Sequence, residues 1–272
     1  MKVALVQTHL FWENRKKNLE HFSALLKNIK GADLIILPEM FTSGFSMNTE
    51  TVAERSGAET LDWLKNEARK KKAVICGSTA VKQGKFNYNR LFWVQPEGTV
   101  KSYDKRHLFR MGKEDEHYKA GKKKLLVQYK GWKFCPLICY DLRFPVWSRN
   151  KFRFKKPAPG TKPSPSGSWD YDVLIYVANW PDVRAYPWKQ LLIARAIENQ
   201  CYVIGVNRVG KDGNGIDHAG ISLCISPKGE IIHEATAHKQ SVALIDLDKG
   251  SLEKFRHVFP AGLDADAFSI NF

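Results

Sequence analysis

The sequence has few cysteines and nothing that suggests a disulfide framework. Its 272 residues include five cysteines, and no two of them form a CxxC pair. An odd number of cysteines without a recognisable signal peptide predicts free thiols in a reducing cytoplasm. The apolar run within residues 1–7 is too short for a secretion signal or a membrane span. We therefore expect a cytoplasmic protein without disulfides and without a membrane partner.

Patterns for metal ions and nucleotide cofactors are also missing. No spacing of His, Cys and Asp residues resembles a metal site. The glycine-rich stretch 210–215 does not match GxGxxG, and we interpret it as a turn. No histidine stands in a catalytic triad motif, although His107 and His117 lie near Lys105, which leaves a cysteine–histidine pair as an alternative. The sequence predicts neither a metal nor a cofactor.

Acidic residues are scarce relative to basic ones. Lysine and arginine number 43 against 28 aspartates and glutamates, which gives a formal net charge of +15. Such an excess suggests nucleic-acid binding, which is the non-enzymatic alternative for this chain. The lysine runs at 70–72, 122–124 and 155–156 are not accompanied by an RRM-like aromatic signature or zinc-finger spacing. A solvated surface explains them more simply, so we expect no nucleic-acid partner.

What the chain does have is a large apolar fraction, 43% of its residues, in an α/β order. The expected strands are 3–7, 34–37, 73–77, 89–95, 100–103, 125–129, 132–138, 173–177, 202–206, 220–226, 231–234 and 242–246, and the expected helices are 14–30, 59–72, 145–149 and 187–200. We expect the last three strands to form one closing antiparallel set. No repeat or linker interrupts the order, so we expect one domain over residues 1–272. Residues 151–169 are basic and Pro/Gly/Ser-rich, which predicts an exposed loop.

Three polar residues follow predicted strands closely: Glu39, Lys105 and Cys139. Open α/β sheets place their chemistry at such strand ends. A glutamate can take the thiol proton as general base, and a lysine can stabilise an oxyanion together with the N–H of the next residue, Tyr140. That set is sufficient for acyl transfer from an amide carbon. Each residue has a structural alternative: a core thiol for Cys139, a helix cap or surface acid for Glu39, and a solvated loop residue for Lys105.

The segments around these residues carry a resemblance. Leu37–Phe41 (LPEMF), Tyr103–Phe109 (YDKRHLF) and Cys139–Pro145 (CYDLRFP) resemble, in order and spacing, the three catalytic motifs of the nitrilase superfamily of carbon–nitrogen hydrolases. The similarity runs from Val3 to about Asp246, and residues 151–169 look like an insertion. Four further stretches resemble the omega-amidase branch: Phe109–Met111, His117–Gly121, Val177–Pro181 and Ala194–Gln200. The resemblance implies a four-layer α-β-β-α sandwich that assembles through its helical face as a homodimer or larger homo-oligomer.

The resemblance also implies further site residues. A second glutamate should support the lysine and the leaving amine, and Glu114 fits its spacing better than Glu116 does. A substrate carboxylate needs a cation, and Arg143, four residues past the nucleophile, is the nearest candidate. Its structural alternative is an ion pair with Asp141. Trp180 is expected to wall the pocket or to belong to the core.

The activity implied is hydrolysis of short 2-oxo ω-amides, such as 2-oxoglutaramate and 2-oxosuccinamate, through a cysteine thioester. The partners expected are this small amide and water. If Arg143 proves structural, Arg110 and Lys113 are the next cations to consider. Other superfamily activities remain alternatives: another amidase, an N-carbamoyl hydrolase or a nitrilase. The intact Glu39, Lys105 and Cys139 argue against a catalytically silent binding protein. The chain has no ATP-pyrophosphatase-like region, which disfavours an amide synthase.

Overall fold

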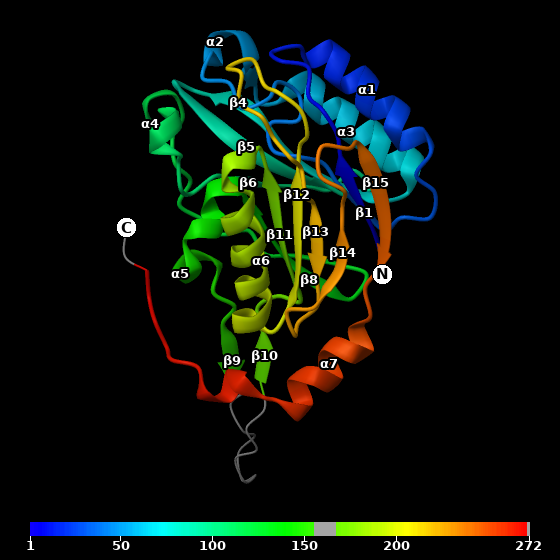
Figure 1. Ribbon diagram of the computed structural model, residues 1–272, viewed down its shortest axis with the longest axis vertical. Helices are drawn as coiled ribbons and strands as arrows, with labels where there is room; N and C mark the ends of the chain where they lie inside the picture. The colour runs from blue at the N-terminus through cyan, green and yellow to red at the C-terminus, as the bar shows by residue number, and fades with distance from the viewer. Residues whose placement is uncertain (155–166, 271–272) are drawn as a thin grey trace.

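The framework of the protein is a pair of β-sheets (Figure 1), seen in a computed structural model that describes residues 1–154 and 167–270. The first sheet has the strand order β15-β1-β2-β4-β5-β6, with β3 beside β4, and the second has the order β14-β13-β12-β11-β8-β7. The first comprises β1 (Lys2–Gln7), β2 (Leu34–Ile36), β3 (Glu54–Arg55), β4 (Val74–Gln83), β5 (Phe86–Val94), β6 (Val100–Asp104) and β15 (Ser241–Asp246). The second comprises β7 (Val127–Tyr129), β8 (Trp132–Ile138), β11 (Val173–Ala178), β12 (Tyr202–Asn207), β13 (Leu223–Ile225) and β14 (Ile231–Glu234).

Each sheet has a parallel centre. Strand β2 lies between β1 and β4 and is parallel to both, and β11 lies between β8 and β12 in the same way. The sheets are extended by antiparallel pairing of β5, β6 and β15 in the first and of β7, β13 and β14 in the second. Because parallel strands end at the same edge of a sheet, the segments that follow β2, β8 and β11 emerge where chemistry can be assembled.

The prediction of one closing antiparallel set is wrong for its last strand. Strands β13 and β14 form a hairpin beside β12, but β15 crosses to the other sheet and pairs with β1, from Lys2 opposite Asp246 to Gln7 opposite Ser241. The crossing buries Ile245 and Leu247 in the core between the sheets. This burial explains why the strand closes the first sheet rather than extending the second.

Side-chain alternation along the strands produces four layers. In β1, Val3 and Leu5 pack in the core between the sheets, whereas Ala4 and Val6 pack in a second core under two helices. Those helices, α1 (Arg15–Lys27) and α3 (Ala58–Lys71), cover the outer face of the first sheet, and α6 (Ala185–Asn199) covers the second (Figure 1). The α-β-β-α sandwich expected from the sequence is confirmed.

Helix α1 shows why the sequence forms these layers. The Asn14 side chain caps the helix by accepting a hydrogen bond from the Lys17 backbone N–H at 3.0 Å. Leu19, Phe22 and Leu26 recur every three or four residues and are buried against the first sheet. A polar cap and an apolar stripe together fix where the helix begins and which face it buries.

The remaining helices of the described chain are short, apart from the one that follows β15. They are α2 (Thr49–Val52), α4 (Glu114–His117), α5 (Pro145–Ser148), α7 (Lys249–Val258) and four 3₁₀ turns, η1 (Arg110–Gly112), η2 (Cys139–Arg143), η3 (Asp182–Arg184) and η4 (Ala261–Asp264). Helix α7 was not predicted, although Leu252, Phe255 and Val258 recur at helical spacing and were a usable signal. No helix within residues 1–154 and 167–270 is long and apolar enough to cross a membrane.

The predicted loop at 151–169 is wrong at both of its ends. Residues 152–154 form β9 (Phe152–Phe154), which pairs in antiparallel register with β10 (Gly167–Trp169). The pairing places Phe152 opposite Trp169, and their rings lie edge to face at 5.4 Å. Aromatic packing therefore overrides the loop-like composition at these ends. The rest of the predicted loop, residues 155–166, lies outside the described residues.

A glycine in β12 tests the contact between α6 and the second sheet. A methyl group on Gly205 would lie 2.6 Å from a Leu192 methyl and 2.7 Å from the Trp188 ring, both on α6. Gly205→Ala should therefore lower the free energy of unfolding by about 1–3 kcal/mol through overpacking, measured by urea denaturation. The matched control is Gly250→Ala, where the nearest atom, an Asp248 oxygen, is 3.4 Å away. Equal stability of the two variants would contradict close packing at Gly205.

Candidate active site

Both sheets contribute to a single cavity of about 470 Å³. Glu39 lies just after β2 and Lys105 just after β6, while Cys139 follows β8 and Asn179 follows β11. All four line the cavity, together with parts of the segments 109–112, 180–184 and 212–218. The three residues predicted from the strand ends therefore lie together, although 66 positions separate Glu39 from Lys105.

A buried ion-pair network joins Lys105 to two glutamates. The Lys105 Nζ lies 2.8 Å from Glu39 Oε1 and 2.9 Å from Glu114 Oε2, and all three side chains are inaccessible to solvent. Burial alone would lower the pKa of the Lys105 ammonium, but the Glu114 and Glu39 carboxylates raise the pKa well above its usual range. Burial raises the pKa of the Glu114 carboxyl group, whereas the charge of Lys105 lowers it. The lysine is thus held as a cation beside the thiol.

The structure places Glu114, and not Glu116, against Lys105. Glu114 is buried on α4, and its Oε2 accepts the Phe109 backbone N–H at 2.7 Å, whereas Glu116 on the same short helix is exposed. Asn89 on β5 was not identified from the sequence. Its side-chain amide donates to Glu39 at 2.8 Å and to Glu114 at 3.1 Å, so it links the two carboxylates. No motif pointed to Asn89, because its role depends on strand pairing.

Cys139 occupies a strained backbone position at the start of η2. Its φ is +42°, in the left-handed region that residues with a Cβ rarely adopt. Burial raises the pKa of the Cys139 thiol well above its usual range, and the Glu39 carboxylate raises it further, whereas Lys105 acts in the opposite direction. The resting group is therefore a neutral thiol with a base beside it, rather than a stable thiolate.

Asp141 fixes the turn that carries Cys139. Its buried carboxylate accepts hydrogen bonds from the Tyr103 hydroxyl at 2.7 Å and from the Ile138 backbone N–H at 3.1 Å. It also pairs with the His107 ring at 2.8 Å, and that ring stacks on Phe144. Asp141 thus ties the turn to the segment that carries Lys105. The cysteine–histidine alternative is not supported, because His107 pairs with Asp141 and His117 is exposed.

Asn179 connects the second sheet to Glu39. Its backbone N–H donates to Glu39 Oε2 at 2.8 Å, and its side-chain amide donates to the Glu39 backbone carbonyl at 2.5 Å. Trp180, the next residue, is buried and lines the cavity, as its predicted role as a wall requires. Asn179 lies within the stretch Val177–Pro181 and was not predicted as a site residue, although an asparagine at a strand end was a usable signal.

The glycine-rich stretch 210–215 is a turn, as expected, but it also belongs to the cavity wall. Asp212, Asn214, Ile216 and His218 line the cavity, and the Asp212 side chain accepts the backbone N–H groups of Asn214 and Ile216, each at 2.9 Å. A Cβ on Gly213 would lie 2.4 Å from the Trp12 ring, so glycine is needed for this close approach. The contribution of this turn to the cavity was not predicted, because the turn carries no catalytic motif.

Two arginines line the cavity, and only one was anticipated. Arg143 lies over the Trp180 ring, with 5.2 Å from its guanidinium carbon to the ring centroid, and Arg184 lies over Phe109 at 5.5 Å. The structural alternative for Arg143 fails, because Asp141 pairs with other residues. Arg110 and Lys113 do not line the cavity: Arg110 is exposed and paired with Asp115, and Lys113 is exposed.

A cysteine, a carboxylate and a lysine that share one cavity of an α-β-β-α sandwich are the groups that acyl transfer through a thiol requires. Residues 2–151 and 169–257 match the sequence model of the carbon–nitrogen hydrolases. The chain belongs to the carbon–nitrogen hydrolase family and is a hydrolase of amide carbon–nitrogen bonds. The resemblance to the nitrilase superfamily is thereby confirmed.

Individual relatives agree with this assignment. The chain is 45% identical to Omega-amidase YafV of Escherichia coli K12 over 270 residues, which cover 99% of this chain and 98% of that one. It is 35% identical to the 2-oxoglutaramate amidase of Bacillus subtilis, over 91% of this chain and 89% of that one. The crystal structure of XC1258 from Xanthomonas campestris, a CN-hydrolase superfamily protein with an arsenic adduct in its active site, has a TM-score of 0.93. Its identity is 42%, and the match covers 100% of this chain and 99% of XC1258.

The opposing effects of Glu39 and Lys105 on the thiol can be measured. Glu39→Gln removes the negative charge that raises the pKa of Cys139, so the titration should move to lower pH. Lys105→Met removes the charge that lowers this pKa, so the titration should move to higher pH. Both shifts are measured from the thiolate absorbance and from the rate of thiol alkylation as functions of pH. The Cys139→Ala variant is the blank. A shift of Glu39→Gln to higher pH would contradict the electrostatic description.

Proposed function

We propose that this enzyme is an omega-amidase that hydrolyses short 2-oxo dicarboxylate monoamides, such as 2-oxoglutaramate and 2-oxosuccinamate, to the acid and ammonia. The observation that carries the proposal is the buried Lys105–Glu39–Glu114 network beside the Cys139 thiol. The full-length similarity to Omega-amidase YafV and to a 2-oxoglutaramate amidase supports the substrate class. The catalytic residues are Glu39, Lys105, Cys139 and Glu114, and Tyr140, Arg143 and Trp180 bind the substrate.

In the acylation half-reaction, Glu39 accepts the Cys139 proton while Sγ attacks the amide carbon. The oxyanion of the tetrahedral intermediate is held by the Lys105 ammonium and the Tyr140 backbone N–H. Glu39 then gives its proton to the amide nitrogen, and the carbon–nitrogen bond breaks. Ammonia departs, and the acyl group remains bound to Cys139 as a thioester. The raised pKa of the thiol fits this order, because the proton is removed only as the attack proceeds.

In the second half-reaction, Glu39 takes a proton from water, and the resulting hydroxide attacks the thioester carbon. Collapse of the intermediate breaks the carbon–sulfur bond, and the proton returns from Glu39 to the thiolate. Glu114 holds the Lys105 ammonium with two contacts, at 2.9 and 3.1 Å, so the oxyanion partner stays in place through both halves. The cycle consumes one amide and one water and needs no cofactor.

The substrate carboxylate is assigned to Arg143. A buried carboxylate needs a cation, and a guanidinium offers two parallel donors to its oxygens. Arg143 lines the cavity over Trp180 and is free of any ion pair with a described residue, so its donors are available to a ligand.

We further propose one domain over residues 1–272 with an insertion at 151–169, a homodimeric assembly and a cytoplasmic location. The family model leaves residues 152–168 unmatched, which supports the insertion. The exposed apolar side chains of Val183, Tyr186 and Ile197, on η3 and α6, support assembly through this helical face. Sedimentation velocity tests the oligomeric state, and a monomer at micromolar concentration would contradict it.

The covalent route predicts graded losses among the site variants. Cys139→Ala should abolish ammonia release, because no nucleophile remains. Glu39→Gln should lose about 10²–10⁴-fold in kcat for want of a general base, and Lys105→Met about 10²–10³-fold for want of an oxyanion donor. Cys224→Ala, a buried cysteine outside the cavity, is the control and should keep most activity. If Cys139→Ala retains a tenth of wild-type activity, the nucleophile lies elsewhere.

The substrate class predicts a ranking in a panel of carbon–nitrogen compounds. Ammonia release should be fastest from 2-oxo ω-amides and weak or absent from neutral nitriles, because a neutral nitrile offers no carboxylate to Arg143. N-carbamoyl amino acids do carry a carboxylate, and they are included to test the alternative acyl group. The panel is measured as kcat/KM with Cys139→Ala as the blank. Preference for a nitrile or a carbamoyl compound would move the enzyme to another branch of the family.

A further inference from the structure

We propose that Arg184 is a second substrate-binding residue, which holds the 2-oxo acid end of the substrate with Arg143 and selects 2-oxo acids against their 2-amino counterparts. This inference rests on the proposed function and deepens it. Nothing in the sequence motifs indicates Arg184, because it stands at the end of η3, just before α6, 45 positions after the nucleophile Cys139 in the numbering of the chain.

Arg184 reaches across the cavity to the segment after Lys105. Its guanidinium carbon lies 5.5 Å from the centre of the Phe109 ring, and its Nη2 donates to the Met111 sulfur at 3.1 Å. A thioether is a weak acceptor and offers no charge. Among described residues no carboxylate pairs with Arg184. The contacts with Phe109 and Met111 therefore position the guanidinium on the cavity wall, and no described carboxylate pairs with it.

Trp180 contacts both arginines of the cavity wall. Its indole N–H donates to the Arg184 backbone carbonyl at 2.7 Å, and its ring lies under the Arg143 guanidinium at 5.2 Å. The same buried tryptophan thus lies under the Arg143 guanidinium and holds the backbone of Arg184, whose guanidinium lies over Phe109 in the same cavity. Two such groups provide donors for a carboxylate and for the adjacent 2-oxo oxygen, which is the arrangement of acceptors in a 2-oxo acid.

The described carboxylates of the cavity wall are already engaged. Glu39 accepts hydrogen bonds from Lys105, Asn89 and Asn179. Asp212 accepts two backbone N–H groups of its own turn. Within the described part of the chain, the wall therefore offers the guanidiniums of Arg143 and Arg184 without ion-pair partners, and both of its carboxylates already accept hydrogen bonds from protein groups, Asp212 through Oδ1 alone. A 2-amino acid would place its ammonium beside these two guanidiniums, and that repulsion disfavours it.

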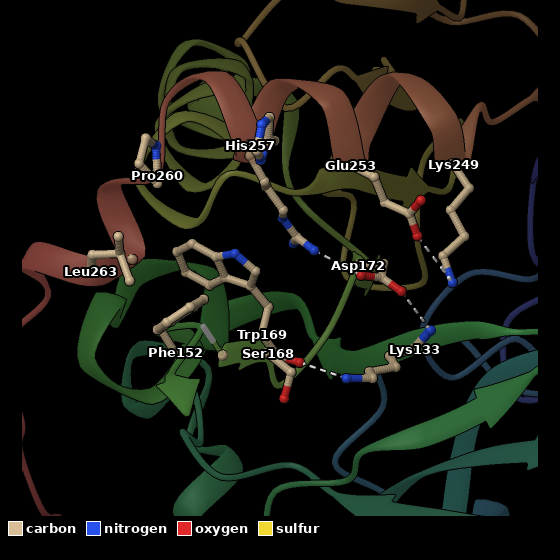
Figure 2. Close-up of a pocket in the computed structure, with 13 residues that line it drawn as sticks. Lys133, Phe152, Ser168, Trp169, Asp172, Lys249, Glu253, His257, Pro260 and Leu263 are labelled. Atoms are coloured by element: carbon tan, nitrogen blue, oxygen red, sulfur yellow. Dashed lines mark hydrogen bonds and ion pairs between the residues drawn. The ribbon is translucent and has the colours of Figure 1, made fainter. Parts of the chain in front are cut away.

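A second cavity shows how a structural arginine differs. This cavity, of about 430 Å³, lies between α7 and the β9–β10 pair (Figure 2). Its Arg256 also lies on a tryptophan ring, that of Trp169 at 5.1 Å, but it pairs with Asp172 at 2.8 Å. The neighbouring Lys249 pairs with Glu253 at 3.8 Å (Figure 2). The Arg256–Asp172 pair fastens α7 to the segment before β11, whereas Arg143 and Arg184 have no carboxylate partner among the described residues.

The test compares Arg184→Met, Arg184→Lys and the matched control Arg110→Met. Arg110 is exposed, is paired with Asp115 and lies outside the cavity wall, so its loss changes net charge near the same segment without removing a cavity contact. For each variant, kcat and KM are measured on 2-oxoglutaramate, on its neutral methyl ester and on glutamine. Binding of 2-oxoglutarate to each variant in the Cys139→Ala background is measured by calorimetry.

Arg184→Met should raise KM for 2-oxoglutaramate and Kd for 2-oxoglutarate by about ten- to a hundred-fold, the value of a charged contact. Its kcat/KM on the neutral ester should change by less than about threefold, and the preference for 2-oxoglutaramate over glutamine should fall. Arg184→Lys should recover part of the loss, and Arg110→Met should resemble the wild type.

Equal losses on the acidic and neutral substrates would overturn the proposal, because Arg184 would then only hold Phe109 and Met111 in place. An unchanged Kd for 2-oxoglutarate would overturn it as well. If the wild type fails to hydrolyse 2-oxoglutaramate, the proposed function fails, but the 2-oxoglutarate binding comparison still decides whether Arg184 holds a carboxylate.

Discussion

The site depends on one buried cation, the ammonium of Lys105, held between Glu39 and Glu114. Burying three charges is expensive unless each has good partners, and removing one partner leaves an uncompensated charge. The partners come from several elements: the amide of Asn89 on β5, the backbone N–H of Phe109 and the backbone N–H of Asn179 after β11. Each of these groups is fixed by a strand or by a tight turn. The fold thus provides donors that water would otherwise supply.

Burial, and after it the Glu39 carboxylate, determines the state of the nucleophile. With Glu39 already bound to Lys105, Cys139 remains protonated, and its pKa is raised by burial and by Glu39. The strained backbone at Cys139 is stabilised by Asp141, which ties the turn to Tyr103 and His107. The charge of Glu39, the strained backbone and the hydrogen bonds of Asp141 therefore all act on the residue that carries the sulfur.

The sequence predicted much of this framework, because strands buried on both faces are conspicuous. The observed bounds of β8, Trp132–Ile138, coincide with the predicted ones. Other features depend on partners distant in sequence. Glu114 and Glu116 share one turn of helix, and only the folded chain shows which one faces Lys105. Arg184 gains its place from Phe109 and Met111, about seventy positions earlier, so no local pattern could reveal it. The β9–β10 pair likewise depends on aromatic packing across a composition typical of loops.

The hydrogen bond from Asn179 to Glu39 joins residues 140 positions apart. Such a contact forms only after a long loop has closed, and it cannot exist in a chain that is still emerging or only partly folded. The first sheet alone would hold Glu39 and Lys105 without their sulfur, and the second alone would hold Cys139 without its base. Catalytic competence is therefore a property of the completed sandwich, and neither sheet has it alone.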